Sequence, residues 1–383
     1  MTQALPPVPS VQKPEWLNTV AELDAWLDAH RHQPLALDTE FERVSTFYPI
    51  PGLVQLGAGD SLRLAEPSVV EQSARFRERL ADPDSVKLLY AMGEDLELFR
   101  HWLKLEPAGL LDLQIGAALA GAGFSMGYGR LVENLFGETL DKSATRSDWL
   151  ARPLSDDQLR YALDDIRFLP ALYQWVTVEL EARGMPEAMA EETRRFATDL
   201  LALSEPENWY LKLRGGWHLS PEKQGVLKAL VTWREEECRR RDRPRNRVLS
   251  DNGLINLADR LPETTGAMAA VDDVPAVVVR RYGDHLLGLI RDALAAGEIP
   301  EPLIERPLTR PQQDQYRKVK KPMARIAEKS DVPVELLAPR KRLESLLRQS
   351  DPQALQVFAS GWRGQILAPV LDDIKVLLEN QHE

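Results

Sequence analysis

The sequence predicts an α/β domain, built on a mixed sheet flanked by helices, followed by two small all-α domains. Two observations support this fold class. Up to residue 204, short apolar runs first follow one another and then alternate with helical patterns, which is typical of a mixed sheet covered by helices. After residue 205 the strand signal almost disappears, and a cluster of prolines at 300–311 separates two helical stretches.

These boundaries divide the chain into four parts. A length of 383 residues suits two or three domains. We therefore predict the following segments: an α/β domain at 1–204, a helical domain at 205–298, a proline-rich linker at 299–311 and a second helical domain at 312–383.

The α/β domain is expected to open with a helix and a sheet. Apolar residues recur every three or four positions over 14–30, which predicts an amphipathic helix. Short apolar runs bounded by Gly, Asp and Pro predict a three-strand meander at 34–41, 52–59 and 61–67. The sheet therefore begins with consecutive strands.

Strands and helices then alternate. We expect a strand at 86–92, a helix at 93–105, and a strand end running into a helix at 110–122. A long helix is predicted over 155–180, capped by Ser155 and bent near Pro170.

The remaining segments are predicted to be helical. Ser220 followed by Pro221 is a good helix start, so a helix is expected over 220–241. Further helical patterns lie at 336–349 and 362–380.

Composition excludes several classes of protein. With 44% hydrophobic and 28% charged residues, the chain is typical of a soluble globular protein. It has no apolar run long enough to span a membrane, and its start lacks the features of a signal peptide. We therefore expect a cytoplasmic protein with no membrane partner. The single cysteine, Cys238, excludes a disulfide framework, and the glycine runs complete no dinucleotide-binding or P-loop motif.

The negative charge lies in the first half of the chain. The whole chain carries a net charge of −11, whereas residues 1–204 alone carry −13 and residues 301–383 carry +2. An acidic half with clustered carboxylates suits divalent cations, and a neutral to basic half can approach phosphates. Simple solubility explains the same asymmetry, so charge alone does not decide between these interpretations.

Carboxylates at particular spacings are the candidate site residues. Asp38 and Glu40 are two apart on a predicted strand, so both point to one face. Two adjacent anions favour a divalent cation, although strand-end acids are often simply solvated. Asp95 lies in the first turn of a predicted helix. Tyr161 and Asp165 lie four apart on one helix face, and spacing alone does not separate Asp165 from Asp164.

Three motifs in order carry a family resemblance. DTEF at 38–41, GEDLELF at 93–99 and YALDDIRFL at 161–169 resemble the motifs of DEDD exonucleases. Tyr161, four residues before the last acid, matches the tyrosine subtype, since the histidine subtype would have His where this chain has Arg160. The resemblance implies an RNase H-like exonuclease fold and two divalent metal ions, Mg²⁺ or Mn²⁺. The metal ligands it implies are Asp38, Glu40, Asp95 and Asp165.

Within this class the chain most resembles the ribonuclease D family. Residues 45–56 and 140–162 are similar to stretches of that family, and 210–262 resemble an HRDC domain. The resemblance implies an HRDC domain followed by a second HRDC-like domain, in a monomer with a ring-like arrangement. It also implies a 3′–5′ exoribonuclease that releases 5′-mononucleotides and trims tRNA precursors and other small structured RNAs.

The motifs leave two alternatives open, which are a DNA proofreading-type 3′–5′ exonuclease and a catalytically inactive nucleic-acid-binding module. Whether the enzyme acts on RNA or on DNA, Tyr161 is expected to orient a metal-bound water, because a phenol with a pKa near 10 is a poor general base at neutral pH.

Basic residues are the candidate RNA contacts. The run RRRDRPRNR at 239–247 holds six arginines, of which we select Arg239, Arg241 and Arg243 for phosphate contacts. A solvated charged face is the alternative. The family resemblance adds Lys142 and Arg146, and the basic string at 317–322 is a second candidate.

Overall fold

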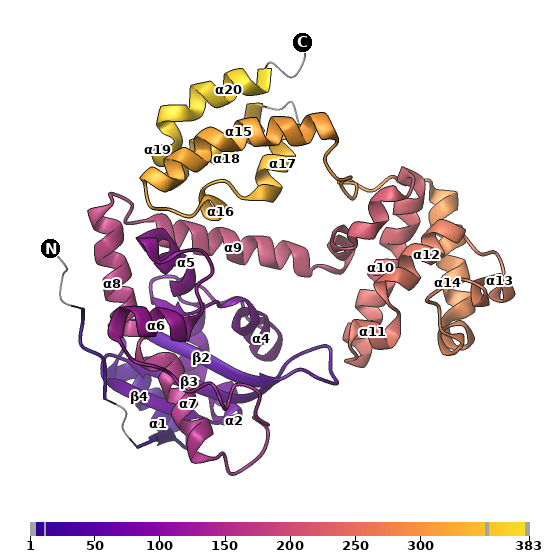
Figure 1. Cartoon of the computed structure of the whole chain (residues 1–383). Helices are drawn as coiled ribbons and strands as arrows, with labels where there is room; N and C mark the ends of the chain where they lie inside the picture. Colours follow the sequence, from indigo (N-terminus) through magenta and orange to yellow (C-terminus); the bar gives the residue numbers. More distant parts are fainter. Residues whose placement is uncertain (1–4, 11–12, 349–351, 380–383) are drawn as a thin grey trace. The chain divides into compact units, whose positions relative to one another are not determined.

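The computed structural model describes residues 5–10, 13–348 and 352–379. They form two compact units (Figure 1). The first contains the described residues of 1–42, 51–197 and 308–383, and the second contains 43–50 and 198–307.

A mixed sheet lies at the centre of the first unit, as predicted. In the described residues its strand order is β1-β4-β3-β2-β5-β6. Its strands are β1 (Trp16–Leu17), β2 (Leu35–Glu42), β3 (Ile50–Ala58), β4 (Ser61–Ala65), β5 (Lys87–Leu89) and β6 (Leu110–Asp112). β3 and β4 pair antiparallel, whereas β2–β5, β5–β6 and β1–β4 are parallel. The last two predicted strands therefore extend the sheet beyond the opening strands.

Helices surround this sheet (Figure 1). Their bounds are α1 (Val20–Ala29), α2 (Pro67–Gln72), α3 (Ala74–Ala81), α4 (Gly93–Leu103), α5 (Leu113–Ala117), α6 (Tyr128–Phe136), α7 (Asp156–Arg167), α8 (Leu169–Ala182) and α9 (Ala188–Ser204). A π-helical turn, η1 (Ala118–Ala122), follows α5.

The long helix predicted at 155–180 is two helices. Ser155 and Gln158 form a capping box that starts α7. α7 ends at Arg167, and α8 begins two residues later with Pro170 in its first turn. Proline lacks the N–H that would continue the helical ladder, so the expected bend occurs here.

The prediction that the first helix includes Trp16 and Leu17 is wrong. These residues form β1 and pair with Leu64 and Ala65. The helix begins only at Val20, because the Thr19 side chain accepts the N–H of Glu22 and caps the helix there. Local periodicity alone could not reveal the partner strand.

The C-terminal helices belong to the first unit. They are α15 (Arg310–Lys329), α16 (Val334–Leu337), α17 (Arg340–Arg348), α18 (Pro352–Ala359), α19 (Gly361–Leu367), η4 (Ala368–Val370) and α20 (Leu371–Glu379). Val319 and Met323 share one buried apolar cluster with Val176 and Met189. A buried ion pair adds to this packing, since an Arg363 nitrogen lies 2.7 Å from a Glu192 oxygen. The predicted residues Gln349 and Asn380 lie outside the described part of the chain.

The second unit is helical. Its elements are η2 (Pro206–Lys212), η3 (Arg214–His218), α10 (Pro221–Arg241), α11 (Arg245–Val248), α12 (Asp251–Arg260), α13 (Thr265–Ala269) and α14 (Ala276–Ala296). Ser220 caps α10, as predicted. Phe47, from the segment between β2 and β3, joins its buried core. Asp242 accepts hydrogen bonds from the N–H groups of Phe47 and Tyr48, both at 2.9 Å.

Among the described residues, no helix has the length and apolar character that crossing a membrane requires.

Candidate active site

Three carboxylates from two elements converge in the first unit. Asp38 and Glu40 point to the same side of β2, and Asp165 comes from α7. One oxygen of each lies within 4.8 Å of the other two. The alternation along a strand brings the first pair together, and the packing of α7 against β2 adds the third.

Asp95 lies close to this cluster. It occupies the first turn of α4 and is 7% exposed. The hydroxyl of Thr39, the residue between Asp38 and Glu40, donates a hydrogen bond to Oδ1 of Asp95. Each of the four acids predicted from the motifs therefore lies in one region, and Thr39 connects the strand acids to the α4 acid.

Burial and mutual repulsion raise the pKa of these carboxyl groups. The pKa of Asp38 lies well above its usual value because of burial first, and then because of Asp95, Asp165 and Glu40. Burial, with Asp165 and Asp95, raises the pKa of Glu40 to about 9. Burial is also the main cause that raises the pKa of Asp95 and of Asp165 to about 7.

This donor set fits a hard divalent cation. Carboxylate oxygens are the ligands that Mg²⁺ and Mn²⁺ prefer. Four acids this close cannot all ionise cheaply without a compensating positive charge. A bound cation would supply that charge and replace the protons that the raised pKa values indicate.

Tyr161 adjoins the acid from α7. Its hydroxyl donates a hydrogen bond to the Asp165 carboxylate, which lowers the pKa of Asp165 against the larger effect of burial. Burial first, and then the charge of Asp165, raise the pKa of Tyr161 above its usual value of 10. The phenol therefore keeps its proton at neutral pH and acts as a hydrogen-bond donor.

The structure separates Asp165 from Asp164. Arg167 lies 2.9 Å from Oδ1 of Asp164 and 2.7 Å from an oxygen of Glu138. Asp164 is therefore committed to an ion-pair network, whereas Asp165 belongs to the acid cluster. The alternative that spacing left open is thus settled by tertiary contacts.

Sequence reasoning missed two residues that fix the strand and the helix carrying these acids. Gln55, fully buried on β3, donates from Nε2 to Oδ2 of Asp38 over 3.4 Å. Tyr128, in the first turn of α6, donates its hydroxyl proton to the backbone carbonyl of Asp164, 2.7 Å away. A glutamine inside the apolar run GLVQLGAG was the available signal for Gln55, because buried polar groups need partners.

Asp112 is a third missed residue. From the end of β6 it accepts the N–H groups of Ala91 at 3.0 Å and Met92 at 3.1 Å. Ala91 has a φ of 57°, which is uncommon for a residue with a Cβ. Asp112 therefore holds the turn that starts α4 and so positions Asp95. Its place at a predicted strand end was the signal.

The segment 137–154 lies beside Tyr161. The Trp149 ring is buried and centred 5.9 Å from the Tyr161 ring, and Thr145 hydrogen-bonds to Tyr161. Gly52 on β3 permits this packing, because a Cβ there would come within 2.7 Å of the Trp149 carbonyl oxygen. Lys142 and Arg146 lie on the same segment and are exposed.

The arginines of 239–247 lie in the second unit, and several are already paired. An Arg239 nitrogen lies 2.9 Å from buried Glu235, and Arg241 pairs with Glu237. Arg243, by contrast, is exposed, and no hydrogen bond or ion pair engages its side chain within the described ranges. Intramolecular carboxylates thus neutralise two of the three arginines selected from the sequence.

Comparison with known proteins now identifies the family. Residues 14–181 match the 3′-5′ exonuclease family model, and residues 223–290 match the HRDC domain model. Ribonuclease D of Pseudomonas paraeruginosa is 39% identical over 366 residues, which cover 93% of this chain and 96% of that protein. The chain belongs to the ribonuclease D family. The resemblance seen in the three motifs is confirmed.

Solved structures of this family support the same assignment. The crystal structure of Escherichia coli RNase D has a TM-score of 0.85 to this chain at 31% identity, covering 97% of this chain and all of that one. The sequence of Escherichia coli Ribonuclease D is 33% identical to this chain over 346 residues. The predicted fold class is confirmed. The HRDC model matches one segment, so a second HRDC-like domain stays a prediction.

Proposed function

We propose that this ribonuclease D family member is a divalent-metal-dependent 3′–5′ exoribonuclease that releases 5′-mononucleotides. The observation that carries the proposal is the cluster of Asp38, Glu40 and Asp165 oxygens within 4.8 Å of one another. Support also comes from the relative in Escherichia coli, described as an exoribonuclease involved in structured RNA processing.

Asp38, Glu40, Asp95 and Asp165 would hold two ions, Mg²⁺ or Mn²⁺. Bound divalent ions supply an activated water and stabilise negative charge on the attacked phosphate and the leaving 3′ oxygen. The chain's own residues fix the ligands. Thr39 donates to Asp95 and Gln55 donates to Asp38, so each oxygen keeps its orientation.

Tyr161 would orient the attacking water rather than remove its proton. Its pKa is raised by burial first, so it remains a phenol at neutral pH. A phenol that donates to Asp165 can also accept a hydrogen bond from a nearby water. In this role its loss slows the reaction without preventing metal binding.

The substrates we propose are tRNA precursors and other small structured RNAs with a single-stranded 3′ end. Lys142 and Arg146 lie on the segment that reaches Tyr161, which suits contact with the strand being shortened. Arg239, Arg241 and Arg243 would contact phosphates elsewhere, and Arg243 has the most freedom to do so. We further propose that the protein acts in the cytoplasm as a monomer.

A 5′-labelled RNA with a structured body and a single-stranded 3′ tail tests this function. The native protein and Asp38→Ala are compared with Mg²⁺, with Mn²⁺ and with chelator, and a DNA of matched sequence is included. We expect stepwise shortening from the 3′ end that requires metal and Asp38 and prefers RNA.

Equal activity on DNA would favour a proofreading-type exonuclease. Retained RNA binding without any shortening would indicate an inactive binding module. Either result overturns the proposal.

A further inference from the structure

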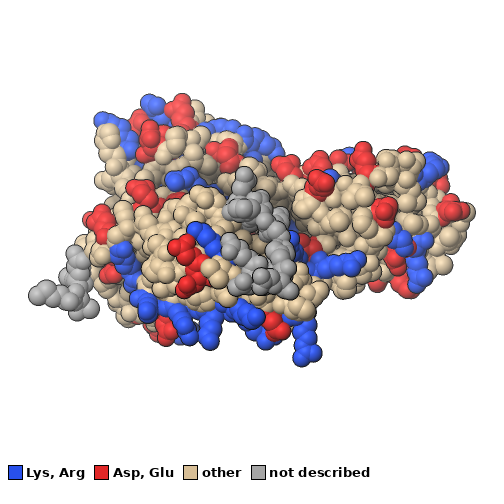
Figure 2. All heavy atoms as spheres, turned by 90° about the horizontal axis from the view of Figure 1, so that it is seen from above, with Lys and Arg blue, Asp and Glu red and all other residues tan. Residues whose placement is uncertain are grey.

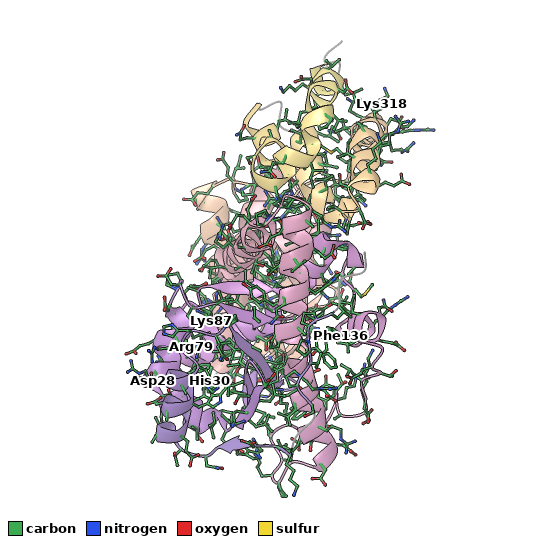
Figure 3. The ribbon with its side chains drawn as sticks, turned by 90° about the vertical axis from the view of Figure 1, so that its left-hand side faces the viewer. Asp28, His30, Arg79, Lys87, Phe136 and Lys318 are labelled. Atoms are coloured by element: carbon green, nitrogen blue, oxygen red, sulfur yellow. The ribbon has the colours of Figure 1, made fainter. Side chains whose placement is uncertain are left out.

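One exposed face of α15 carries an unpaired basic stripe, consisting of Lys318, Lys321, Arg325 and Lys329. All four residues are exposed, and within the described residues no hydrogen bond or ion pair engages their side chains. Figure 3 shows Lys318 on the outer side of its helix. Figure 2 shows Lys and Arg side chains in a row along the lower edge of that view.

Helical geometry places the four residues together. At 3.6 residues per turn they fall within an arc of about 80° and extend over about 16 Å of helix. The opposite face of α15 is buried through Val319, Met323 and Ala327. The stripe is therefore free of the packing that holds the helix in place.

The local charge is strongly positive. Residues 310–329 contain seven Lys and Arg against Asp314 and Glu328, in a chain of net charge −11. Asp314 is engaged by Arg317, with 3.2 Å between the charged atoms. Glu328 is exposed at the edge of the stripe. Four positively charged side chains on one helix face raise the local concentration of anions.

The contrast with α10 strengthens this interpretation. There, Arg239 is paired with Glu235 and Arg241 with Glu237. On α15 no such compensation occurs for the stripe, so its charge remains available to a partner. The basic stripe of α15 is thus less compensated by carboxylates than Arg239 and Arg241 are.

We propose that the α15 stripe binds the phosphate backbone of the RNA body while the 3′ end is shortened. The four cations are spread along about 16 Å of helix, so several of them can face phosphates of one strand at the same time. Lysine and arginine on a rigid helix make contacts that are independent of sequence, as a general processing enzyme needs. This proposal rests on the proposed function, because it assumes that RNA is the substrate.

The test compares two variants with the same change in charge. The stripe variant is Lys318→Gln, Lys321→Gln, Arg325→Gln. The control is Lys13→Gln, Arg31→Gln, Arg75→Gln, at exposed positions of the first unit away from α15. Affinity for a hairpin RNA with a single-stranded 3′ tail is measured against salt concentration, without divalent metal so that no hydrolysis occurs.

We expect the stripe variant to bind the hairpin at least about tenfold more weakly. The slope of log binding constant against log salt concentration should fall in magnitude by about two to three, because three phosphate contacts are lost. Its kcat/KM should fall more on the hairpin than on a short unstructured oligoribonucleotide. Unchanged affinity and slope, or an equal loss in the control variant, would overturn the proposal.

The outcome is separable from that of the proposed function. The binding measurement needs no turnover, so it tests the stripe even where the native protein fails to shorten the short oligoribonucleotide. Such a failure would overturn the proposed function alone.

Discussion

Nε2 of Gln55 on β3 donates a hydrogen bond to Oδ2 of Asp38 on the neighbouring strand β2, over 3.4 Å. Asp38 belongs to the acid cluster, and Gln55 is fully buried. Its Oε1 has no hydrogen-bond partner among the described residues. The hydrogen bond to Asp38 gives this buried glutamine a partner within an otherwise apolar strand.

Gln55→Met should weaken metal binding and activity. The substitution keeps the side chain's length but removes the donor that orients Asp38, and the loss of such a supporting hydrogen bond typically costs 10–100-fold. The Mn²⁺ concentration that gives half-maximal activity is the measurement. Gln72→Met, at an exposed position of α2, is the control. An unchanged midpoint in Gln55→Met would show that Asp38 needs no support.

Asp165→Asn should abolish turnover while Asp164→Asn should not. Asp165 is a proposed metal ligand, and the loss of such a ligand would remove several kcal/mol of transition-state stabilisation, or about 10³-fold in rate. Asp164 is instead paired with Arg167, which also keeps Glu138 as a partner, and we expect a loss of stability of about 1–3 kcal/mol there. Exonuclease assays and thermal unfolding of both variants check this. Equal activity in the two variants would reject the assignment of Asp165.

The stability of the metal-free protein should fall as pH rises through neutrality. Folded-state pKa values are about 9 for Glu40 and about 7 for Asp95 and Asp165, above the usual values of 4.5 for glutamate and 3.8 for aspartate. The folded protein therefore keeps protons that the unfolded chain releases. Their stabilising effect is complete below the unfolded pKa values and is lost as pH rises through 7 and then 9.

Mg²⁺ should reverse this loss, because the cation takes the place of those protons. The rise in melting temperature on adding Mg²⁺ is therefore expected to be small at about pH 6 and larger at about pH 8. Melting curves across this range, with and without Mg²⁺, make the measurement. A rise that is the same at every pH would contradict the proton–metal exchange.

Glu235→Ala should destabilise the second unit by about 3–5 kcal/mol. Glu235 is fully buried against Arg234, and Arg239 and Arg245 also reach it. Burial raises the pKa of Glu235, but hydrogen bonds and charges from these arginines outweigh it, so its pKa is lowered. Removing the carboxylate leaves buried Arg234 with Asp251, 2.6 Å away and exposed, as its remaining ion-pair partner, and leaves Arg239 and Arg245 without the carboxylate that they share.

Hydrogen exchange of α10 and α14 measures this effect. Glu236→Ala, at the exposed neighbouring position, is the control and should leave exchange unchanged. Similar protection in both variants would show that the buried pairs do not hold the unit together.

Local patterns in the sequence determined much of the site. Strand alternation placed Asp38 and Glu40 on one face, and the four-residue spacing of Tyr161 and Asp165 placed them on one side of a helix. Both inferences depend on periods of the backbone, which any continuous segment reveals. The three motifs, in their order along the chain, indicate the family from the sequence alone.

Tertiary structure alone decided which charges remain available. Asp164 and Asp165 are adjacent in sequence, yet only Asp165 reaches the acid cluster, because α7 packs on β2 in one orientation and Arg167 engages Asp164. Arg239 and Lys318 were both candidates for phosphate contact. Glu235 neutralises Arg239, whereas no carboxylate in the described residues pairs with Lys318. The sequence determines which residues are charged, but contacts between distant segments determine the ion-pair partner of each charge.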